Sequence, residues 1–157
     1  MKLLVILGGG GHTTEMLKLV NLLGPGYEYH YLLVKEVSFS QDRIEIPGKV
    51  HQVRRPRGMH DSVWVTVVNS GIALAQITIT LLKVRPQAVI GCGPAVSVLA
   101  SIVGKLIGAK AIHVETGSRV STLSLSGKIM YKIADLFFVQ WTPLKDKHPK
   151  AIYAGRL

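Results

Sequence analysis

Residues 3–16 read LLVILGGGGHTTEM: a short apolar run, four consecutive glycines, and then a histidine and two threonines that open a helical stretch. A tight turn uses one or two glycines, because few positions in it require a positive φ. Four in a row indicate that something must come very close to the main chain. The stretch therefore predicts a buried strand, a glycine-rich turn and a helix, with a ligand against the turn.

Apolar runs of strand length alternate with helical segments along the rest of the chain. The runs that predict strands are 3–7, 27–34, 49–53, 86–95 (ending in a glycine turn), 110–115 and 136–140. The segments that predict helices are 12–23, 63–83, 96–107 and 126–134. Strands that are apolar throughout and alternate with helices are typical of a parallel sheet covered on both faces. We therefore expect an α/β fold, a single Rossmann-like doubly wound parallel sheet over residues 1–157, with 142–157 as a basic C-terminal tail.

Size and charge narrow the class of protein. A chain of 157 residues with 48% hydrophobic residues is the usual size of one folded domain and is unlike a disordered segment. Lys and Arg total 19 against 9 Asp and Glu, a formal charge of +10. Such an excess indicates an anionic partner: nucleic acid, a phosphorylated substrate or an acidic membrane. The single cysteine, Cys92, excludes an intrachain disulfide and fits a reducing compartment.

The glycine turn stands where doubly wound sheets bind ligands, at the carboxyl end of the first strand. Its candidate binding residues are Gly8, Gly9, Gly10, Gly11 and Thr13. Glycines let phosphate oxygens or a sugar approach the backbone, and the N–H groups of the following helix attract negative charge. The alternative is a plain strand–helix turn of small residues.

Two nucleotide motifs match this turn poorly. Gly8-x-Gly10-x-x-Thr13 lacks the third glycine of the dinucleotide fingerprint, although Glu36 follows the second predicted strand where a ribose-binding acid would stand. A Walker loop is excluded, because no Lys-Ser or Lys-Thr follows the glycines at the required spacing. His12 lies in the first turn of the predicted helix, where it would bind an anion, take a proton from a hydroxyl or merely cap the turn.

Two further strand ends are expected on the same rim. GCGPAVS (91–97) is a second glycine turn that runs into a helix. Gly91, Gly93 and Pro94 are its candidate phosphate-binding residues, or else a tight turn with the proline at the first helical position. HVETGSRV (113–120) supplies Glu115, which would bind a sugar hydroxyl, act as a base, or cap a helix or pair with a cation. The polar residues that accompany this glutamate are Thr116, Ser118 and Arg119.

A basic loop beside a long apolar segment favours a membrane surface. The loop RRPRG carries Arg54, Arg55 and Arg57, and the segment 63–82 begins with Trp64 in its second position. Three arginines near an anionic leaflet contribute about 3 kcal/mol, so burial of apolar side chains is needed as a second signal. The alternatives are a solvated loop and, for 63–82, a core helix, a true membrane span or two shorter elements.

The sequence offers little support for a metal site, a serine nucleophile or a nucleic-acid-binding site. The six histidines are dispersed, with no cluster of cysteine or carboxylate beside them, so we predict no metal site and no cofactor. No G-x-S-x-G nucleophile motif occurs. The charge suits nucleic acid, but with three phenylalanines and no recognised binding motif we predict that nucleic acid is not the partner.

The motifs together resemble a known family. GGGGHTTEM resembles the N-terminal glycine motif of GT-B glycosyltransferases that act on lipid-diphosphate acceptors. With GCGP, the run from HVETGSRV to FFVQW (113–141) and the ending KAIYAGRL, the whole chain is similar to the acceptor-side, membrane-anchoring subunit of the bipartite UDP-N-acetylglucosamine transferase of asparagine-linked glycosylation. Bacterial relatives assist glycosyltransferases of polysaccharide assembly.

The resemblance implies half of an enzyme: the N-terminal, acceptor-binding domain of a GT-B transferase, on the cytoplasmic face of a membrane. A separate UDP-sugar-binding subunit would be the partner, so that the chain is expected to be inactive alone. The resemblance makes residues 142–157 a partner-binding tail, with the contact at Ile152, Tyr153, Gly155, Arg156 and Leu157.

In this interpretation the glycine turns hold a polyprenyl or dolichyl diphosphate, Arg119 neutralises phosphate, and His12 or Glu115 activates the acceptor hydroxyl. Eukaryotic members carry a transmembrane helix before the glycine motif, so we expect an archaeal or bacterial member. The alternatives are a non-catalytic scaffold that recruits the transferase to the membrane and a stand-alone NAD(P)-binding protein.

Overall fold

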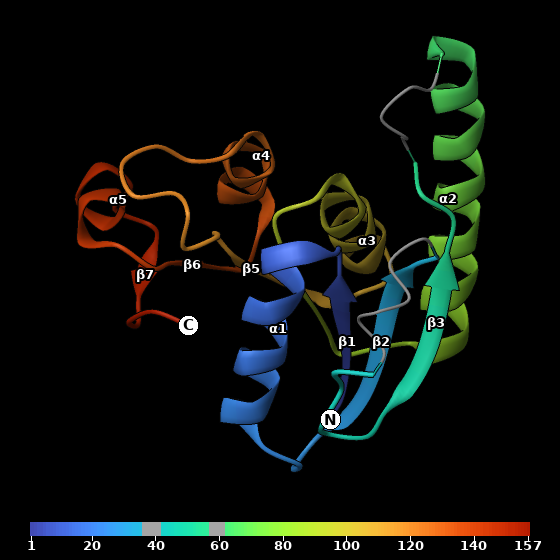
Figure 1. Ribbon diagram of the computed structural model, residues 1–157, viewed down its shortest axis with the longest axis horizontal. Coiled ribbons are helices and arrows are strands. Elements are labelled where there is room, and N and C mark those ends of the chain that lie inside the picture. The colour runs from blue at the N-terminus through green and yellow to red at the C-terminus, as the bar shows by residue number, and fades with distance from the viewer. Residues whose placement is uncertain (36–41, 57–61) are drawn as a thin grey trace.

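The computed structural model describes residues 1–35, 42–56 and 62–157 (Figure 1). Its centre is a seven-stranded sheet in the order β3-β2-β1-β4-β5-β6-β7, in which every neighbouring pair is parallel. The strands are β1 (Lys2–Leu7), β2 (Glu28–Val34), β3 (Lys49–Val53), β4 (Ala88–Cys92), β5 (Lys110–Val114), β6 (Leu136–Val139) and β7 (Ile152–Tyr153). The predicted parallel α/β sheet is confirmed.

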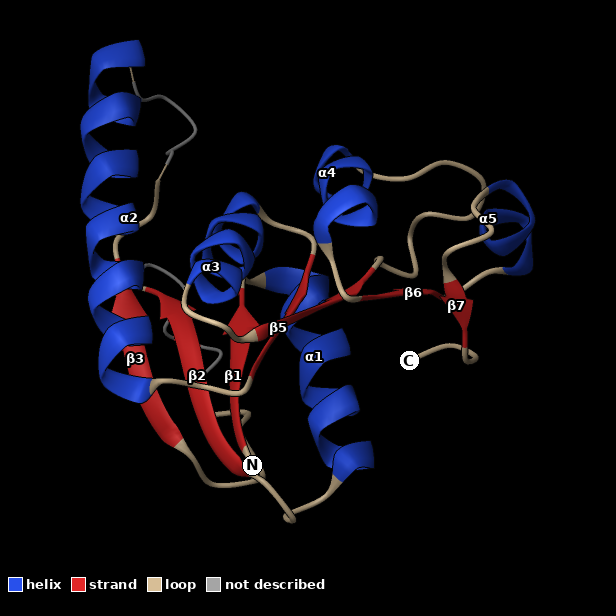
Figure 2. Ribbon diagram, turned by 180° about the vertical axis from the view of Figure 1, so that it is seen from behind, coloured by secondary structure: helices blue, strands red, loops and turns tan. Residues whose placement is uncertain are grey.

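Helices cover both faces of this sheet (Figures 1 and 2). They are α1 (Gly10–Leu23), α2 (Val63–Val84), α3 (Ala95–Leu106), α4 (Leu125–Ile133) and α5 (Thr142–Lys147). One core cluster joins α1 to side chains of β1, β2 and β4, such as Leu3, Val5 and Ile90. The alternate side chains, such as Leu4 and Ile6, pack with α2 and α3 in a second cluster. The first face therefore belongs to α1, and the second to α2, α3 and α4.

The strand order reverses between β1 and β4, because the chain builds outward from β1 to β3 and then returns to build from β4 to β7. Such a reversal opens a crevice at the carboxyl ends of the two strands, where doubly wound sheets bind ligands. Ile6 of β1 pairs with Gly91 of β4, and Cys92 of β4 with Val114 of β5. The three strand ends are thus adjacent, which confirms the prediction that their turns share one rim.

Helix α2 is divided into a packed half and a projecting half. Ala73, Ile77, Leu81 and Val84 are buried against the sheet, and none of them precedes the middle of the helix. The first half rises beyond the carboxyl edge of the sheet (Figure 1), with Trp64 81% exposed. The helix is long and apolar enough to cross a membrane, with a mean hydropathy of 1.7 over its most apolar window. It therefore combines the predicted core helix with an unburied apolar end.

Most ends of the predicted elements are confirmed to within one or two residues. Ser62 caps α2, because its hydroxyl accepts a hydrogen bond from the Val65 N–H. Two differences stand out. The strand predicted over 86–95 is shorter, because Pro94 opens α3. Residues 142–157, predicted only as a basic tail, contain α5 and β7, and β7 pairs with β6 through Phe138 and Ile152.

Candidate functional site

Two glycines of the β1–α1 turn adopt backbone conformations with a positive φ. Gly9 and Gly10 have φ values of 98° and 60°, which side chains rarely adopt. The buried Thr13 hydroxyl accepts a hydrogen bond of 2.8 Å from the Gly9 N–H, so this threonine holds the turn from inside. Among the residues that the structure describes, no side chain caps the N-terminus of α1. The exposed Gly10 and Gly11 therefore present the positive end of the helix to solvent.

The β1–α1 turn and the β4–α3 turn are packed against each other. A Cβ added at Gly8 would collide with the ring of Pro94, and one added at Gly93 would lie 2.5 Å from Cε1 of His12. Gly93 also has a φ of 80°. The imidazole of His12 thus packs against the backbone of the β4–α3 turn. Gly91 is confined too, since a Cβ there would lie 2.6 Å from that of Ser97, so the absence of a side chain at Gly91 lets α3 pack against β4.

His12 belongs to a cluster with Cys92 and Glu15 that was not among the predicted sites. Its Nδ1 lies 3.5 Å from Sγ of Cys92, and that thiol donates a hydrogen bond of 3.0 Å to Oε2 of Glu15. Since the thiol proton points to Glu15, the sulfur accepts from Nδ1–H, and neutral His12 carries its free lone pair on Nε2. Burial, followed by the neighbouring Glu15 carboxylate, raises the pKa of Cys92. The thiol therefore stays protonated.

Glu15 ties α1 to the loop after β5. Its Oε1 accepts from the Gly117 N–H at 2.7 Å and from the Thr116 hydroxyl at 3.2 Å. A charged acceptor makes such hydrogen bonds roughly twice as strong as neutral ones. Glu15 was not among the predicted site residues. The available signal was its position three residues after His12, which places both side chains on one face of a helix.

Glu115 lies on the other face of the sheet. The residue is fully buried, its Oε1 accepts from the Thr116 N–H, and its Oε2 accepts from the N–H and hydroxyl of Ser124 at 3.0 and 3.1 Å. A Cβ on Gly127 would collide with the same oxygen. The structure does not bring Glu115 and His12 together. Consecutive residues along an extended chain point to opposite faces, so Thr116 contacts Glu15 on the α1 side while Glu115 points to the α4 side. In the structure Glu115 anchors the start of α4.

The C-terminal residues are attached to the same loop. The Leu157 N–H donates to Oε1 of Gln140 at 2.8 Å, and Nε2 of Gln140 donates to the Glu115 carbonyl at 3.1 Å. The Trp141 indole donates to the Gly117 carbonyl at 2.7 Å, and the Arg156 guanidinium lies 4.6 Å from the centre of its ring. Leu157 and Arg156 were among the predicted residues, whereas Gln140 and Trp141, which contact them, were not.

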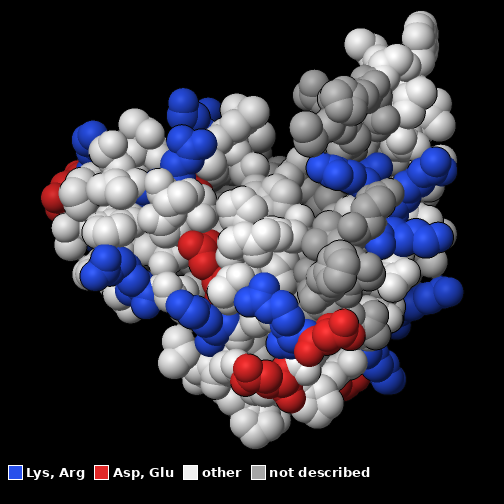
Figure 3. All heavy atoms as spheres, in the orientation of Figure 1, with Lys and Arg blue, Asp and Glu red and all other residues white. Residues whose placement is uncertain are grey.

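The remaining predicted residues lie around the rim. Ser118 and Arg119 are exposed on the loop after β5, and the Arg119 N–H donates to the Thr116 carbonyl. Arg54 and Arg55 are exposed directly after β3, and Arg57 lies outside the described residues, as does Glu36. Lys35 follows β2 at the same edge. In Figure 3 the projecting end of α2 carries no blue or red, while basic side chains gather beside its lower part.

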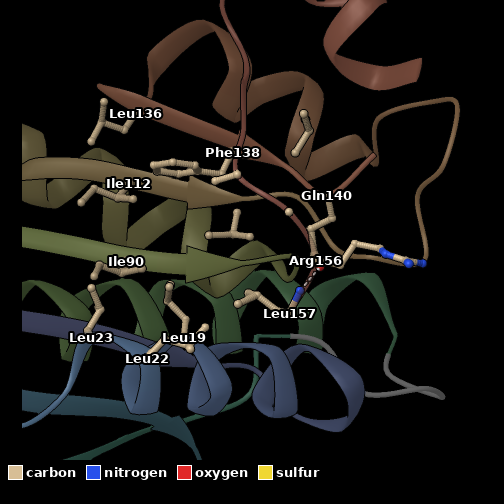
Figure 4. A pocket seen from close by; sticks show the side chains of 14 residues that line it. Leu19, Leu22, Leu23, Ile90, Ile112, Leu136, Phe138, Gln140, Arg156 and Leu157 are labelled. Atoms are coloured by element: carbon tan, nitrogen blue, oxygen red, sulfur yellow. Dashed lines mark hydrogen bonds between the residues drawn. The ribbon is translucent and has the colours of Figure 1, made fainter. Parts of the chain in front are cut away.

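An apolar hollow of about 290 Å³ lies between α1 and strands β4 to β6 (Figure 4). Leu19, Leu22 and Leu23 of α1 form one wall. Ile90, Ile112, Leu136 and Phe138 form its floor, and residues 154–157 close one end. Leu136 is 42% exposed, so the hollow leaves apolar side chains of the sheet open to solvent. Ile152 and Tyr153, also predicted to contact a partner, are exposed in β7.

The structure corrects one premise of the prediction that the chain has no metal site. The histidines are dispersed in sequence, but His12, Glu15 and Cys92 each place one potential ligand atom within 4.8 Å of the others. Cys92 is 80 residues from His12, so the two meet only because β1 and β4 are neighbours in the sheet.

Comparison with known proteins shows the family to which the chain is similar. The family model described as "Oligosaccharide biosynthesis protein Alg14 like" matches residues 3–157. The UDP-N-acetylglucosamine transferase subunit ALG14 of Homo sapiens is 33% identical over 180 residues, which cover 100% of this chain and 83% of the human protein. The corresponding subunit of Schizosaccharomyces pombe is 32% identical, with 98% and 81% covered. Both relatives are eukaryotic, and the archaeal or bacterial origin stays a prediction.

Solved structures share the fold at lower identity. MurG of Acinetobacter baumannii matches with a TM-score of 0.68 and 16% identity over 88% of this chain and 40% of MurG. The UDP-GlcNAc 2-epimerase of Methanocaldococcus jannaschii matches with a TM-score of 0.74 and 17% identity over 99% of this chain and 46% of the epimerase. The chain thus spans less than half of each of these proteins, and the expected likeness to one half of a GT-B glycosyltransferase is confirmed at the level of the fold.

Proposed function

The chain belongs to the Alg14-like family of oligosaccharide biosynthesis proteins, and from that membership we propose that it is the acceptor-side subunit of a two-chain UDP-N-acetylglucosamine transferase. It holds a polyprenyl- or dolichyl-diphosphate sugar at a membrane surface, and a second subunit brings the UDP-sugar. The observation that carries the proposal is the packing of His12 onto Gly93, between two open helix N-termini at one rim.

The diphosphate of the acceptor would lie against the start of α1 and α3. Gly10 and Gly11 are exposed and leave room for phosphate oxygens at the helix end. Over the same described ranges, α3 also begins without a side-chain cap, after Pro94. Free N–H groups and the helix dipole favour an anion at each end. Arg119, exposed on the third turn, adds a full positive charge.

The reaction we propose is an inverting displacement. The 4-hydroxyl of the acceptor sugar attacks C1 of the donor sugar, UDP departs with the electron pair of the broken bond, and the hydroxyl proton passes to His12. The contact of Nδ1 with Cys92 leaves Nε2 as the accepting nitrogen. Glu115 is the other candidate base. Its carboxylate is buried and accepts hydrogen bonds from Ser124 and Thr116, so we assign it the positioning of the loop.

Membrane attachment would use the projecting end of α2. Val63, Trp64, Val67 and Val68 are exposed there, and burying each such side chain contributes about 1.5–3 kcal/mol. Lys35, Arg54 and Arg55 stand at the same edge of the sheet and would face anionic headgroups. Because this edge also carries His12, a lipid-linked acceptor would reach the rim without leaving the membrane surface. We place that membrane face on the cytoplasmic side.

The donor-binding subunit would dock on the apolar hollow. Residues 154–157 line the hollow beside the exposed Leu136 and Leu22, and the family resemblance assigns Gly155, Arg156 and Leu157 among them to this contact. An apolar helix of the partner would cover both. The hydrogen bonds from Leu157 through Gln140 to the loop after β5 then connect the docked partner to the rim. Because that subunit would bind the UDP-sugar, we expect the isolated chain to be inactive.

We expect His12→Ala to lower kcat for GlcNAc transfer by about 10²–10⁴-fold, because the acceptor hydroxyl loses its base. The measurement uses the complex with the co-expressed partner and a lipid-diphosphate-GlcNAc acceptor. His51→Ala in β3 is the matched histidine control. A rate within threefold of wild type would overturn the catalytic assignment and favour a recruiting scaffold. An equal loss for Glu115→Gln, with unchanged melting temperature, would move the role of base to Glu115.

We expect the double variant Val67→Asp, Val68→Asp to bind anionic vesicles at least about 100-fold more weakly, since two apolar side chains leave the bilayer and two charges replace them. Sedimentation with phosphatidylcholine–phosphatidylserine vesicles measures this. Leu82→Asp is the control, because Leu82 is 52% exposed on the same helix at the opposite edge of the sheet. Equal binding of the double variant and wild type would contradict the membrane assignment.

We expect Leu136→Asp to raise the dissociation constant of the partner by about 30-fold or more, because a buried charge replaces an apolar contact at the centre of the interface. Pull-down of the co-expressed subunit and titration by calorimetry measure this. Leu106→Asp, at an exposed leucine that ends α3, is the control. A partner that binds both variants equally well does not dock on the hollow.

A further inference from the structure

Beyond the transfer reaction, we propose that His12, Glu15 and Cys92 form a binding site for Zn²⁺, and that zinc bound there switches off His12. The cluster supplies an imidazole, a carboxylate and a thiol from two elements, α1 and β4. Each type of donor is an established zinc ligand. Three protein ligands with a fourth position left for water are typical of exchangeable or catalytic zinc sites rather than closed structural ones.

Two of the three separations between the ligand atoms are close to those that zinc requires. With Zn–S near 2.3 Å and Zn–N near 2.0–2.1 Å, a tetrahedral site places sulfur and nitrogen about 3.5 Å apart. Sγ of Cys92 and Nδ1 of His12 are 3.5 Å apart, and Sγ and Oε2 of Glu15 are 3.0 Å apart. The third separation is within 4.8 Å. Shifts of a few tenths of an ångström for the pairs with sulfur, and a shortening of up to about 1.5 Å between His12 and Glu15, would complete the geometry.

The surroundings hold these ligands in place. Oε1 of Glu15 is fixed by the Gly117 N–H and the Thr116 hydroxyl, which leaves Oε2 directed at the cluster. Metal-bound carboxylates are oriented by such hydrogen bonds in the same way. The His12 ring is confined by Gly93, where a Cβ would lie 2.5 to 2.7 Å from ring atoms. Cys92 is fully buried at the end of β4.

The donor set selects the kind of ion. A thiolate and an imidazole favour zinc and other borderline or soft cations, whereas Mg²⁺ and Ca²⁺ prefer oxygen ligands. Binding replaces the hydrogen bond between Cys92 and Glu15 with bonds from both side chains to the metal. The thiol proton leaves to solvent, so each zinc bound releases one proton from Cys92.

Zinc at Nδ1 would change His12 as a base. Nδ1 of His12 must be unprotonated to bind the metal, so the ring proton moves to Nε2, and Nε2 becomes a donor. The nitrogen that we assign to the acceptor hydroxyl then has no lone pair for its proton. This effect on rate rests on the proposed function, but binding of the metal does not.

The test titrates the reduced, metal-free full-length chain with Co²⁺, which reports tetrahedral thiolate coordination by its colour, and then displaces it with Zn²⁺. We expect one ion per chain, with a thiolate-to-cobalt absorption band that Cys92→Ser abolishes. His12→Ala and Glu15→Gln should each weaken Zn²⁺ binding by about tenfold or more. His51→Gln is the control, because the side chain of His51 in β3 contacts that of His30 in β2, away from the cluster. Circular dichroism checks the fold of each variant.

X-ray absorption at the zinc edge of the wild-type chain needs no substitution, and we expect one sulfur ligand near 2.3 Å with nitrogen and oxygen near 2.0–2.1 Å. Absence of a sulfur ligand, or equal affinity of Cys92→Ser and wild type, would overturn the site. In the transfer assay, Zn²⁺ should inhibit wild type at concentrations at least tenfold below those that inhibit Cys92→Ser, each relative to its own metal-free rate. Zinc that binds the cluster without inhibiting transfer would refute the switch while leaving the site in place.

Discussion

The close packing of two turns, one after β1 and one after β4, is the constraint on which the rest of the molecule depends. Gly8 admits the ring of Pro94, and Gly93 admits the ring of His12, each at a distance that a side chain on the glycine would forbid. This contact draws the N-termini of α1 and α3 to one rim and fixes His12 between them. Glycine is therefore required here by the approach of a neighbour as much as by a positive φ.

From that rim, Glu15 extends the arrangement across the sheet. Its carboxylate joins the Cys92 thiol to the loop after β5, and that loop is held in turn by Trp141 and Gln140 near the C-terminus. A chain of hydrogen bonds thus links the apolar hollow, which suits a partner, to the candidate catalytic residue His12. The same carboxylate is the third ligand of the inferred zinc site, beside His12 and Cys92, so Glu15 supports both the loop and that site.

Local pattern was enough to predict the parallel sheet and the shared rim, because apolar strands, glycine turns and helices alternate along the chain from Leu3 to Val139. It was insufficient where the answer depended on which strands are neighbours or on which face a side chain points. Cys92 meets His12 through the pairing of β1 with β4. Glu115 lies opposite His12 because it points to the α4 side. The short, charged α5 and the two-residue β7 carried too little periodicity to be seen.

The central claim, that the open ends of α1 and α3 hold the acceptor beside His12, is tested most directly by hydrogen–deuterium exchange. The complex with the donor-binding subunit is compared with and without a short-chain polyprenyl-diphosphate GlcNAc. The account predicts slower exchange at amides 10–13 and 95–97 and unchanged exchange at 24–27 and 107–110, on the opposite edge of the sheet. Slower exchange confined to that opposite edge, or none at either helix start in a complex saturated with acceptor, would contradict it.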